Sequence, residues 1–336
     1  MNNNSSLSVA PTHGWSFVQL AGKDVVKFLN NFCTADLKRL QPGQAQELML
    51  LNAKGHVLSW GSALADDHGM VLMLTGQSAD ETIKHLDAYL FSEDVQLSRG
   101  NVRAWLITAT IQSEKPRRSE LLVPRRGKLC DGLVSGEFPK TTISSSQWCV
   151  WRASHDAWWL ITSDALELSE IVTESASWRS AFPGRTVCLP TSIMDYHQWR
   201  IAASVPVIGQ DSIGNTLPQE LLRDDLAISF TKGCYLGQET VARLDAMGHV
   251  NWNLRTVTLD SLWPEELKDC ESTAPINHVT IRNPEQSLGQ MTSVCGDRAL
   301  VRIRAAAVED FNNKGGLDWQ LCLNDSLMPH RIVQIF

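Results

Sequence analysis

The sequence lacks the cysteine spacings of common metal and redox motifs. Its eight cysteines contain no C-x-x-C pair, and the two closest, Cys130 and Cys149, are 19 residues apart. Zinc ribbons, thioredoxin-like motifs and iron–sulfur sites with closely spaced ligands are therefore not supported. We predict no metal site. We expect seven of the eight cysteines, all except Cys234, to be buried and reduced, and to pack as small hydrophobes.

Long apolar runs and a signal-like beginning are also missing. No run of apolar residues approaches 18, so no membrane-spanning helix is predicted. The first residues, MNNNSSLSVAPTHG, have neither a basic start nor an apolar stretch of signal-peptide length. We therefore expect a cytoplasmic protein without a membrane partner.

Positive charge is scarce as well. The chain has 30 Lys and Arg residues and 37 Asp and Glu residues, which gives a net charge of −7. This balance argues against a broad nucleic-acid-binding face, which needs basic residues to replace counterions. One local basic cluster is interpreted as a solvated surface, with direct tRNA contact as the alternative: Arg117, Arg118, Arg125 and Arg126.

The residues that are present indicate an α+β protein. Strands are predicted at 15–20, 46–52 and 56–64, where apolar residues alternate or form short runs between turns. Helices are predicted from Val25 with Asp24 as its cap, over 78–91 with Ser78 or Asp80 as its cap, and over 195–203. After about residue 250 the pattern changes to short strands with little helix, which is typical of a small β-barrel or sandwich.

The segment KGCYLGQET, residues 232–240, concentrates reactive and turn-forming residues. Lys232 lies two residues from Cys234, and Gly237 is expected to begin a helix whose N-terminus favours negative charge. Both features would lower the pKa of a thiol, and only the thiolate is a strong nucleophile or metal ligand. The other interpretation of these residues is an inert cysteine in a tight loop. No adjacent histidine can act as a base, and the chain has no glycine-rich phosphate loop.

The run KGCYLGQE followed by VAR resembles the signature of the YgfZ family, folate-binding proteins related to the glycine-cleavage T-protein, an aminomethyltransferase. Supporting segments are VQLAGKDVVKFLNNFCTADL, LLNAKGHVLSW, VPVIG and LPQE, in the same order as in the family. The resemblance is weakest from 110 to 185. It implies two intertwined α+β lobes around a central folate pocket and a small C-terminal β-barrel. The domains implied are 1–50 with 186–248, which carries KGCYLGQE, a ferredoxin-like lobe at 51–185, and the barrel at 249–336.

The resemblance also implies tetrahydrofolate or a derivative as cofactor and Cys234 as a working thiol supported by Lys232. Trp15 matches a tryptophan that contacts folate, and Tyr196 or Trp199 could supply a second aromatic ring. The remaining residues expected near folate lie in the signature and its helix: Tyr235, Gln238, Glu239 and Arg243. Core packing is the other interpretation of the three aromatic residues.

Two departures from the T-protein pattern bear on activity. The paired acids of the T-proteins are replaced here by Leu58 and Ser59, and an acid and a glycine near the pterin are replaced by Ala202 and Ser204. The first departure argues against aminomethyl transfer, and the second leaves the strength of pterin binding open.

Three functions are therefore compared. The first is an accessory protein for assembly or repair of iron–sulfur enzymes, including one that thiomethylates tRNA, so that the link to tRNA is indirect. The second is a folate-dependent one-carbon transferase, and the third is a folate-sensing binding module without thiol chemistry. We favour the first and lean against an enzyme.

Overall fold

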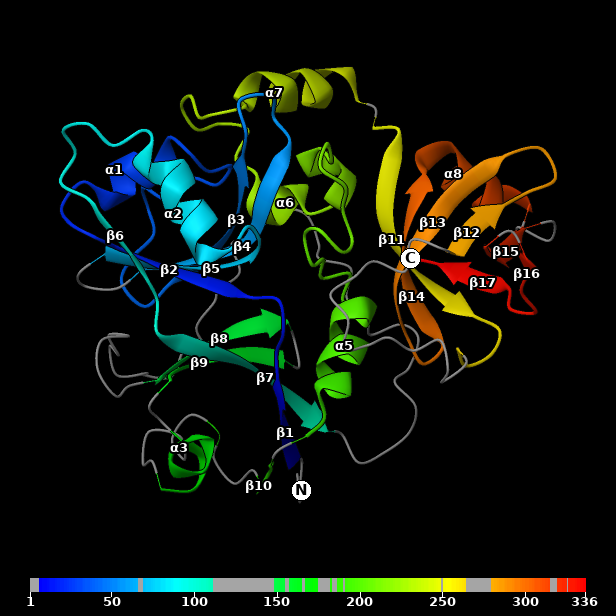
Figure 1. The fold of residues 1–336 in the computed structure, drawn as a ribbon, viewed down its shortest axis with the longest axis horizontal. Helices are drawn as coiled ribbons and strands as arrows, with labels where there is room; N and C mark the ends of the chain where they lie inside the picture. The colour runs from blue at the N-terminus through cyan, green and yellow to red at the C-terminus, as the bar shows by residue number, and fades with distance from the viewer. Residues whose placement is uncertain are drawn as a thin grey trace. The chain divides into compact units, whose positions relative to one another are not determined.

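The computed structural model describes residues 6–65, 69–110, 148–154, 157–164, 167–174, 182, 186–189, 191–248, 250–263, 279–314, 319–324 and 326–336 (Figure 1). The basic cluster at 117–126 lies outside these residues. The chain divides into two compact units, the first made of Met1–Leu50, Gly61–Tyr196 and Asp225–Tyr235, the second of Leu51–Trp60, His197–Asp224 and Leu236–Phe336. The three domains expected from the sequence stay a prediction. Within the described ranges, no helix has the length and apolarity needed to cross a membrane.

The first sheet has the strand order β3-β4-β5-β2-β6. Its strands are β2 (Ser16–Ala21), β3 (Ala45–Leu51), β4 (Val57–Ala65), β5 (Gly69–Gly76) and β6 (Gln96–Arg99). The helices α1 (Val25–Asn30) and α2 (Ala79–Asp87) contribute to one hydrophobic core. The apolar face of α1, including Phe28 and Leu29, is fully buried there. The three strands predicted between residues 15 and 64 are confirmed.

The two helix caps predicted in this region had different outcomes. Ser78 caps α2 with a reciprocal capping box, in which its hydroxyl accepts from the Glu81 N–H and the Glu81 carboxylate accepts from the Ser78 N–H. Asp24 precedes α1 but makes no side-chain cap, so that prediction is wrong. Its carboxylate instead accepts a hydrogen bond of 2.9 Å from the backbone N–H of Asp94, which is distant in sequence.

A second sheet in the first unit has the order β10-β1-β7-β9-β8. It contains β1 (Ser6–Pro11), β7 (Val102–Thr110), β8 (Trp148–Ser154), β9 (Ala157–Ser163) and β10 (Thr186–Cys188), and α3 (Leu168–Glu174) packs into its core. The chain begins in this sheet with β1, forms β2–β6 in the other sheet, and returns with β7–β10. The chain therefore alternates between the two sheets of this unit.

Helices and short turns carry most of the residues of interest. They are α5 (Ile193–Ala202), the 3-10 helix η1 (Pro218–Leu221), α6 (Asp224–Ala227) and α7 (Gln238–Met247). The helix predicted over 195–203 corresponds to α5. The helix predicted to begin after Gly237 is α7.

The C-terminal part is an antiparallel sheet that curls on itself (Figure 1), with the order β16-β15-β12-β13-β14-β11-β17. Its strands are β11 (Trp252–Leu259), β12 (Val279–Arg282), β13 (Ser287–Cys295), β14 (Arg298–Arg304), β15 (Gln320–Leu323), β16 (Ser326–Leu327) and β17 (Ile332–Ile335). Among the described residues β16 and β17 remain edge strands, so the sheet is a curled half-barrel where a small β-barrel or sandwich was expected.

The same region contains a helix that the strand pattern concealed. Helix α8 (Ala305–Lys314) follows β14 without an intervening loop. Its residues Ala307, Val308 and Phe311 are buried in the core of the curled sheet, at the spacing of one helix face. The expectation of little helix after residue 250 was wrong here, because the apolar run of β14 leads directly into these positions.

Candidate functional site

Cys234 is an exposed free thiol in a segment that is otherwise held in place. Gly233 beside it is exposed, while Lys232 and Tyr235 on either side are buried. The backbone is therefore fixed by two buried side chains, and the thiol between them is accessible. Cys188 is the other exposed cysteine among the described residues, which corrects the expectation that only Cys234 departs from a buried role.

The buried Lys232 reaches a segment near the N-terminus. Its Nζ donates to the carbonyl oxygen of Cys33 at 2.9 Å and to that of Ala35, and it lies 3.9 Å from the Cys33 Sγ. Burial lowers the pKa of Lys232, against the effect of the neighbouring Cys33 and Asp36. The described hydrogen bonds of this ammonium go to Cys33 and Ala35, so the contact that the structure gives Lys232 is structural. Its effect on Cys234 stays a prediction.

Two further buried groups surround Lys232. The ring of Tyr235 lies 5.2 Å from the Lys232 Nζ, within the range of a cation–π contact. Burial raises the pKa of Tyr235 to about 12 and that of the Cys33 thiol to about 11, although Lys232 opposes the latter. Both groups are therefore protonated at neutral pH, and Cys33 is not a reactive thiol.

Thr34 ties the chain upstream of Cys234 to the same N-terminal segment. Its hydroxyl donates to the carbonyl of Ala227 at 2.6 Å and accepts from the backbone N–H of Met49 at 2.9 Å. The backbone N–H of Ser229 donates to the Thr34 carbonyl at 2.9 Å. Residues 227–235 are thus fastened at two points to the stretch Cys33–Ala35, two segments that the sequence matched separately to one family.

The start of α7 packs directly against the turn between β3 and β4. Gly237, the residue that precedes the helix, has φ +81°, and Gly55 in the turn has φ +82°. A Cβ on Gly237 would lie 2.7 Å from the Asn52 carbonyl oxygen, and one on Gly55 would lie 2.7 Å from the Cβ of Thr240. The Thr240 hydroxyl donates to the Lys54 carbonyl at 2.9 Å. Both positions therefore require glycine, for backbone conformation and for space.

We expect Gly237→Ala to destabilise the protein more than Gly248→Ala. Gly248 ends the same helix with φ +73°, but a Cβ there would meet nothing within 4 Å. Gly248→Ala should therefore cost only the left-handed strain, about 1–2 kcal/mol, and Gly237→Ala about 1–3 kcal/mol more for the clash. Urea unfolding of both variants measures the difference, and equal losses would contradict the close packing at Gly237.

The other signature residues on α7 point to the surface. Glu239 and Arg243 are exposed, and Gln238 is half-buried. In the described part of the chain the structure gives no ion pair between Glu239 and Arg243, so they do not form the helix pair that the spacing allowed. Their side chains are accessible to a ligand, and their folate contacts stay predictions.

Trp15 belongs to an aromatic cluster in the first unit. Its Nε1 donates to the hydroxyl of Tyr196 at 2.9 Å, and its ring meets that of Trp159 edge to face, with centroids 5.1 Å apart. Tyr196 is fully buried. Trp15 is half-buried and lines a pocket of about 280 Å³, together with residues that include Arg103 and Trp105. Trp15 is therefore accessible to a ligand. The buried Tyr196 holds the indole in place through their hydrogen bond.

Helix α5 carries the positions where the sequence departs from the T-protein pattern. Trp199 is half-buried one turn after Tyr196, and Ala202 is the last residue of the helix. Ser204 has φ +53°, a conformation that favours glycine. Its hydroxyl lies 2.7 Å from that of Thr256. The backbone therefore keeps a glycine-like turn where the family has glycine, although this chain has serine.

The turn after Gly55 supplies no acid. Leu58 is half-buried and Ser59 fully buried in β4. The side chains at the two positions of the T-protein acids thus carry no charge to assist a transfer reaction.

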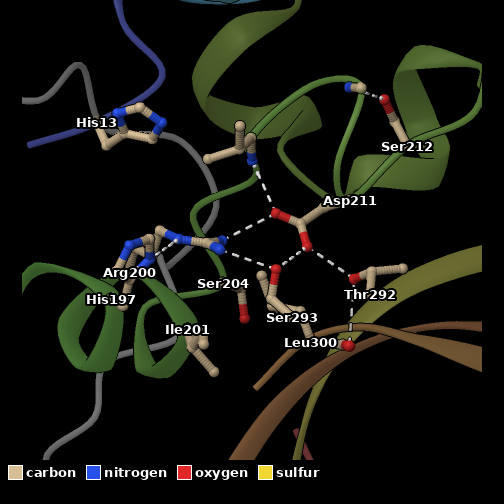
Figure 2. A network of polar contacts seen from close by, with 12 residues as sticks. His13, His197, Arg200, Ile201, Ser204, Asp211, Ser212, Thr292, Ser293 and Leu300 are labelled. Carbon is tan, nitrogen blue, oxygen red and sulfur yellow. Dashed lines mark hydrogen bonds and ion pairs between the residues drawn. The ribbon is translucent and has the colours of Figure 1, made fainter. Parts of the chain in front are cut away.

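A buried polar network in the second unit escaped the sequence analysis (Figure 2). Arg200 on α5 donates from Nη1 to the Asp211 carboxylate at 2.9 Å, from Nη2 to Ser293 at 2.8 Å, and from Nε to the His197 ring at 3.1 Å. Asp211 also accepts from Ser293 at 2.5 Å, from Thr292 at 2.7 Å and from a backbone N–H. Arg200 and Asp211 are at most 1% exposed. The network joins α5 and the loop after it to β13. The only available signal was an arginine among the apolar residues of a predicted helix.

The described residues contain no group of three or more His, Cys, Asp or Glu side chains that could hold a metal ion.

The chain is similar to several proteins of known name. It is 27% identical over 247 residues to the tRNA-modifying protein YgfZ of Yersinia pseudotuberculosis and to that of Yersinia pestis, which covers 72% of this chain and 68% of each relative. It is 24% identical over 233 residues to the tRNA-modifying protein YgfZ of Colwellia psychrerythraea, covering 69% of this chain and 65% of the relative. No family model matches the chain.

In structure the chain resembles the glycine cleavage system aminomethyltransferase T of Bartonella henselae. The TM-score is 0.67 with 14% sequence identity, and the match covers 98% of this chain and 86% of the other. The predicted resemblance to the YgfZ proteins and the predicted T-protein-like fold are thus confirmed.

Proposed function

We propose that the chain is a folate-binding accessory protein that helps to assemble or repair iron–sulfur enzymes in the cytoplasm, with Cys234 as its working thiol. The observation that carries this proposal is the exposed thiol of Cys234 in a segment anchored by the buried Lys232. The similarity to proteins named for tRNA modification supports a role upstream of tRNA thiomethylation. The uncharged side chains at Leu58 and Ser59 argue against aminomethyl transfer by this chain.

The placement of Cys234 suits a reaction with a large partner. An exposed thiol on a fixed backbone can attack a disulfide, accept an adduct or complete the ligand set of a cluster held by another protein. In the last case the client enzyme would supply the other ligands, since one thiolate alone does not hold a cluster. The proposal therefore predicts that function depends on the sulfur of Cys234 rather than on the small size of its side chain.

Folate binding rests on Trp15. The indole lines a pocket whose volume lies near the lower end of the range for small-molecule sites, about 300–1,000 Å³. A pterin or aminobenzoyl ring is flat and can stack on the exposed part of this side chain. The hydrogen bond to Tyr196 and the contact with Trp159 hold the ring in one orientation. Arg103, which lines the same pocket, forms an ion pair with Asp164 at 3.1 Å, so its charge is already matched within the protein.

We expect tetrahydrofolate to quench the tryptophan fluorescence of the protein, and Trp15→Ala to weaken binding about three- to tenfold. This range corresponds to the loss of one aromatic stacking contact. Trp252→Ala, which alters a half-buried tryptophan of the curled sheet in the second unit, serves as the control and should leave the affinity unchanged. Absence of quenching at millimolar folate would contradict folate binding. Equal weakening by both variants would show that Trp15 is not part of the folate site.

The function itself is tested by complementation. A bacterium that lacks its own YgfZ protein should recover thiomethylated tRNA when it expresses this chain, as measured by mass spectrometry of digested tRNA. Failure to recover the modification at a matched protein level would contradict the proposed role.

A further inference from the structure

A second pocket, of about 300 Å³, lies in the second unit and involves none of the residues predicted from the sequence. The turn from Gly209 to Gly214 forms one wall, and strands β13 and β14 contribute Gln290, Thr292 and Arg302 to the other. Asp211 connects this pocket to the buried network of Figure 2, which fixes the turn against β13. The pocket is therefore built on a part of the molecule that is held by buried hydrogen bonds.

Arg302 and Gln290 form a pair on one face of the sheet. They are directly opposite in the antiparallel register of β13 and β14, so their side chains project from the same side. The side chain of Arg302 is 13% exposed. Its guanidinium stacks 4.2 Å from the centre of the Trp252 ring, which holds the planar group in place.

The hydrogen-bonding capacity of Arg302 is largely unused. Its Nε is buried and donates to no other described residue. Its Nη2 lies 3.5 Å from the Glu220 Oε2, which is an ion pair but not a close hydrogen bond. The side-chain amide of Gln290 likewise makes no hydrogen bond with another residue in the described part of the chain. The buried Nε itself is closed to a ligand, but the Nη groups of Arg302 and the amide of Gln290 are available at one pocket.

Of the acidic groups nearby, Glu220 pairs with Arg302 through Nη2, and Asp211 is engaged by other residues. Asp211 accepts four hydrogen bonds, and its charge is matched by Arg200. Burial raises the pKa of Glu220, against the effect of Arg302. The free hydrogen-bonding capacity of the pocket is consequently that of a donor site.

We propose that this pocket binds a small organic oxyanion, a carboxylate or a phosphate ester, through the guanidinium of Arg302 and the amide of Gln290. The fork of an arginine matches the two oxygens of such a group. Thr292 shapes the wall but does not bind the ligand, because its single hydroxyl hydrogen is donated to Asp211 at 2.7 Å, and the same oxygen lies 3.2 Å from the Leu300 carbonyl oxygen. The volume accommodates a small molecule rather than a whole folate.

The test is calorimetric titration of the full chain with glutarate and, separately, with inorganic phosphate. Binding of either probe supports the site, and the probe that binds identifies the class of oxyanion. Arg302→Gln and Gln290→Glu should each weaken binding at least about tenfold, the loss expected for one charge-assisted hydrogen bond. Gln290→Glu is nearly isosteric and keeps the test valid if Arg302→Gln folds poorly.

Arg304→Gln is the matched control. Arg304 also lies over Trp252, at 5.0 Å, but is exposed and does not line the pocket. This variant should bind the probes as the unmodified chain does. The proposal is overturned if neither probe binds at millimolar concentration, if Gln290→Glu binds normally, if Arg304→Gln is as impaired as Arg302→Gln, or if tetrahydrofolate competes with the probes for the same site.

Discussion

Arg200→Met should lower the free energy of unfolding by about 3–5 kcal/mol, the range for breaking a buried ion pair by removing one partner. The substitution leaves the Asp211 carboxylate buried without its counter-charge and removes the donors to Ser293 and His197. Urea unfolding followed by circular dichroism measures the loss. Arg103→Met is the control, because the Arg103–Asp164 pair is half exposed and its loss should cost no more than about 1 kcal/mol.

A double variant separates the charge from the packing. Arg200→Met combined with Asp211→Asn removes both charges, so that no uncompensated buried charge remains, while the asparagine amide oxygen can still accept from Thr292 and Ser293. We therefore expect the double variant to regain part of the stability that Arg200→Met loses. A loss of less than about 1 kcal/mol in Arg200→Met would show that the network does not hold α5 against the curled sheet.

Local pattern predicted those elements whose structure depends on local chemistry. Ser78 was one of the two expected caps of α2, and it caps the helix through a local contact with Glu81, three residues further on. Gly237 begins a helix because a left-handed residue there fits only glycine comfortably. The strands around the turn at Gly55 were recognisable from their apolar alternation.

Contacts between residues distant in the chain could not be predicted in this way. Asp24 had the right type and position for a cap, but the backbone of Asp94 competes for its carboxylate. Lys232 was placed beside Cys234 by sequence, whereas its ammonium donates to carbonyls about 200 positions away. Arg200 and Asp211 pair across a loop whose conformation no short pattern specifies.

The resemblance to a known family predicted features that residue patterns alone did not. The T-protein-like fold has no signature in periodicity, and its prediction followed from the likeness of KGCYLGQE and its companion segments to a known family. The structure also shows that these segments are in contact with one another. Thr34 contacts the chain that leads to Cys234, and Gly55 contacts the residue that precedes α7, so separately matched segments pack together.

Cys234→Ser is the substitution with the largest expected effect on function. Serine keeps the size and exposure of the side chain, and the anchor at Lys232 is untouched, so stability should not change. The hydroxyl is a far weaker nucleophile and soft-metal ligand than a thiolate. The variant should therefore lose most of the activity that depends on the sulfur.

The most direct test of the account measures thiomethylated tRNA in a strain that lacks its own YgfZ protein and expresses one of two variants at matched levels. Cys188→Ser removes the other exposed thiol among the described residues and is the control. We predict that Cys188→Ser restores the modification as the unmodified chain does, while Cys234→Ser leaves it close to the level of the deletion strain. Full restoration by Cys234→Ser would contradict the proposal that this thiol performs the function.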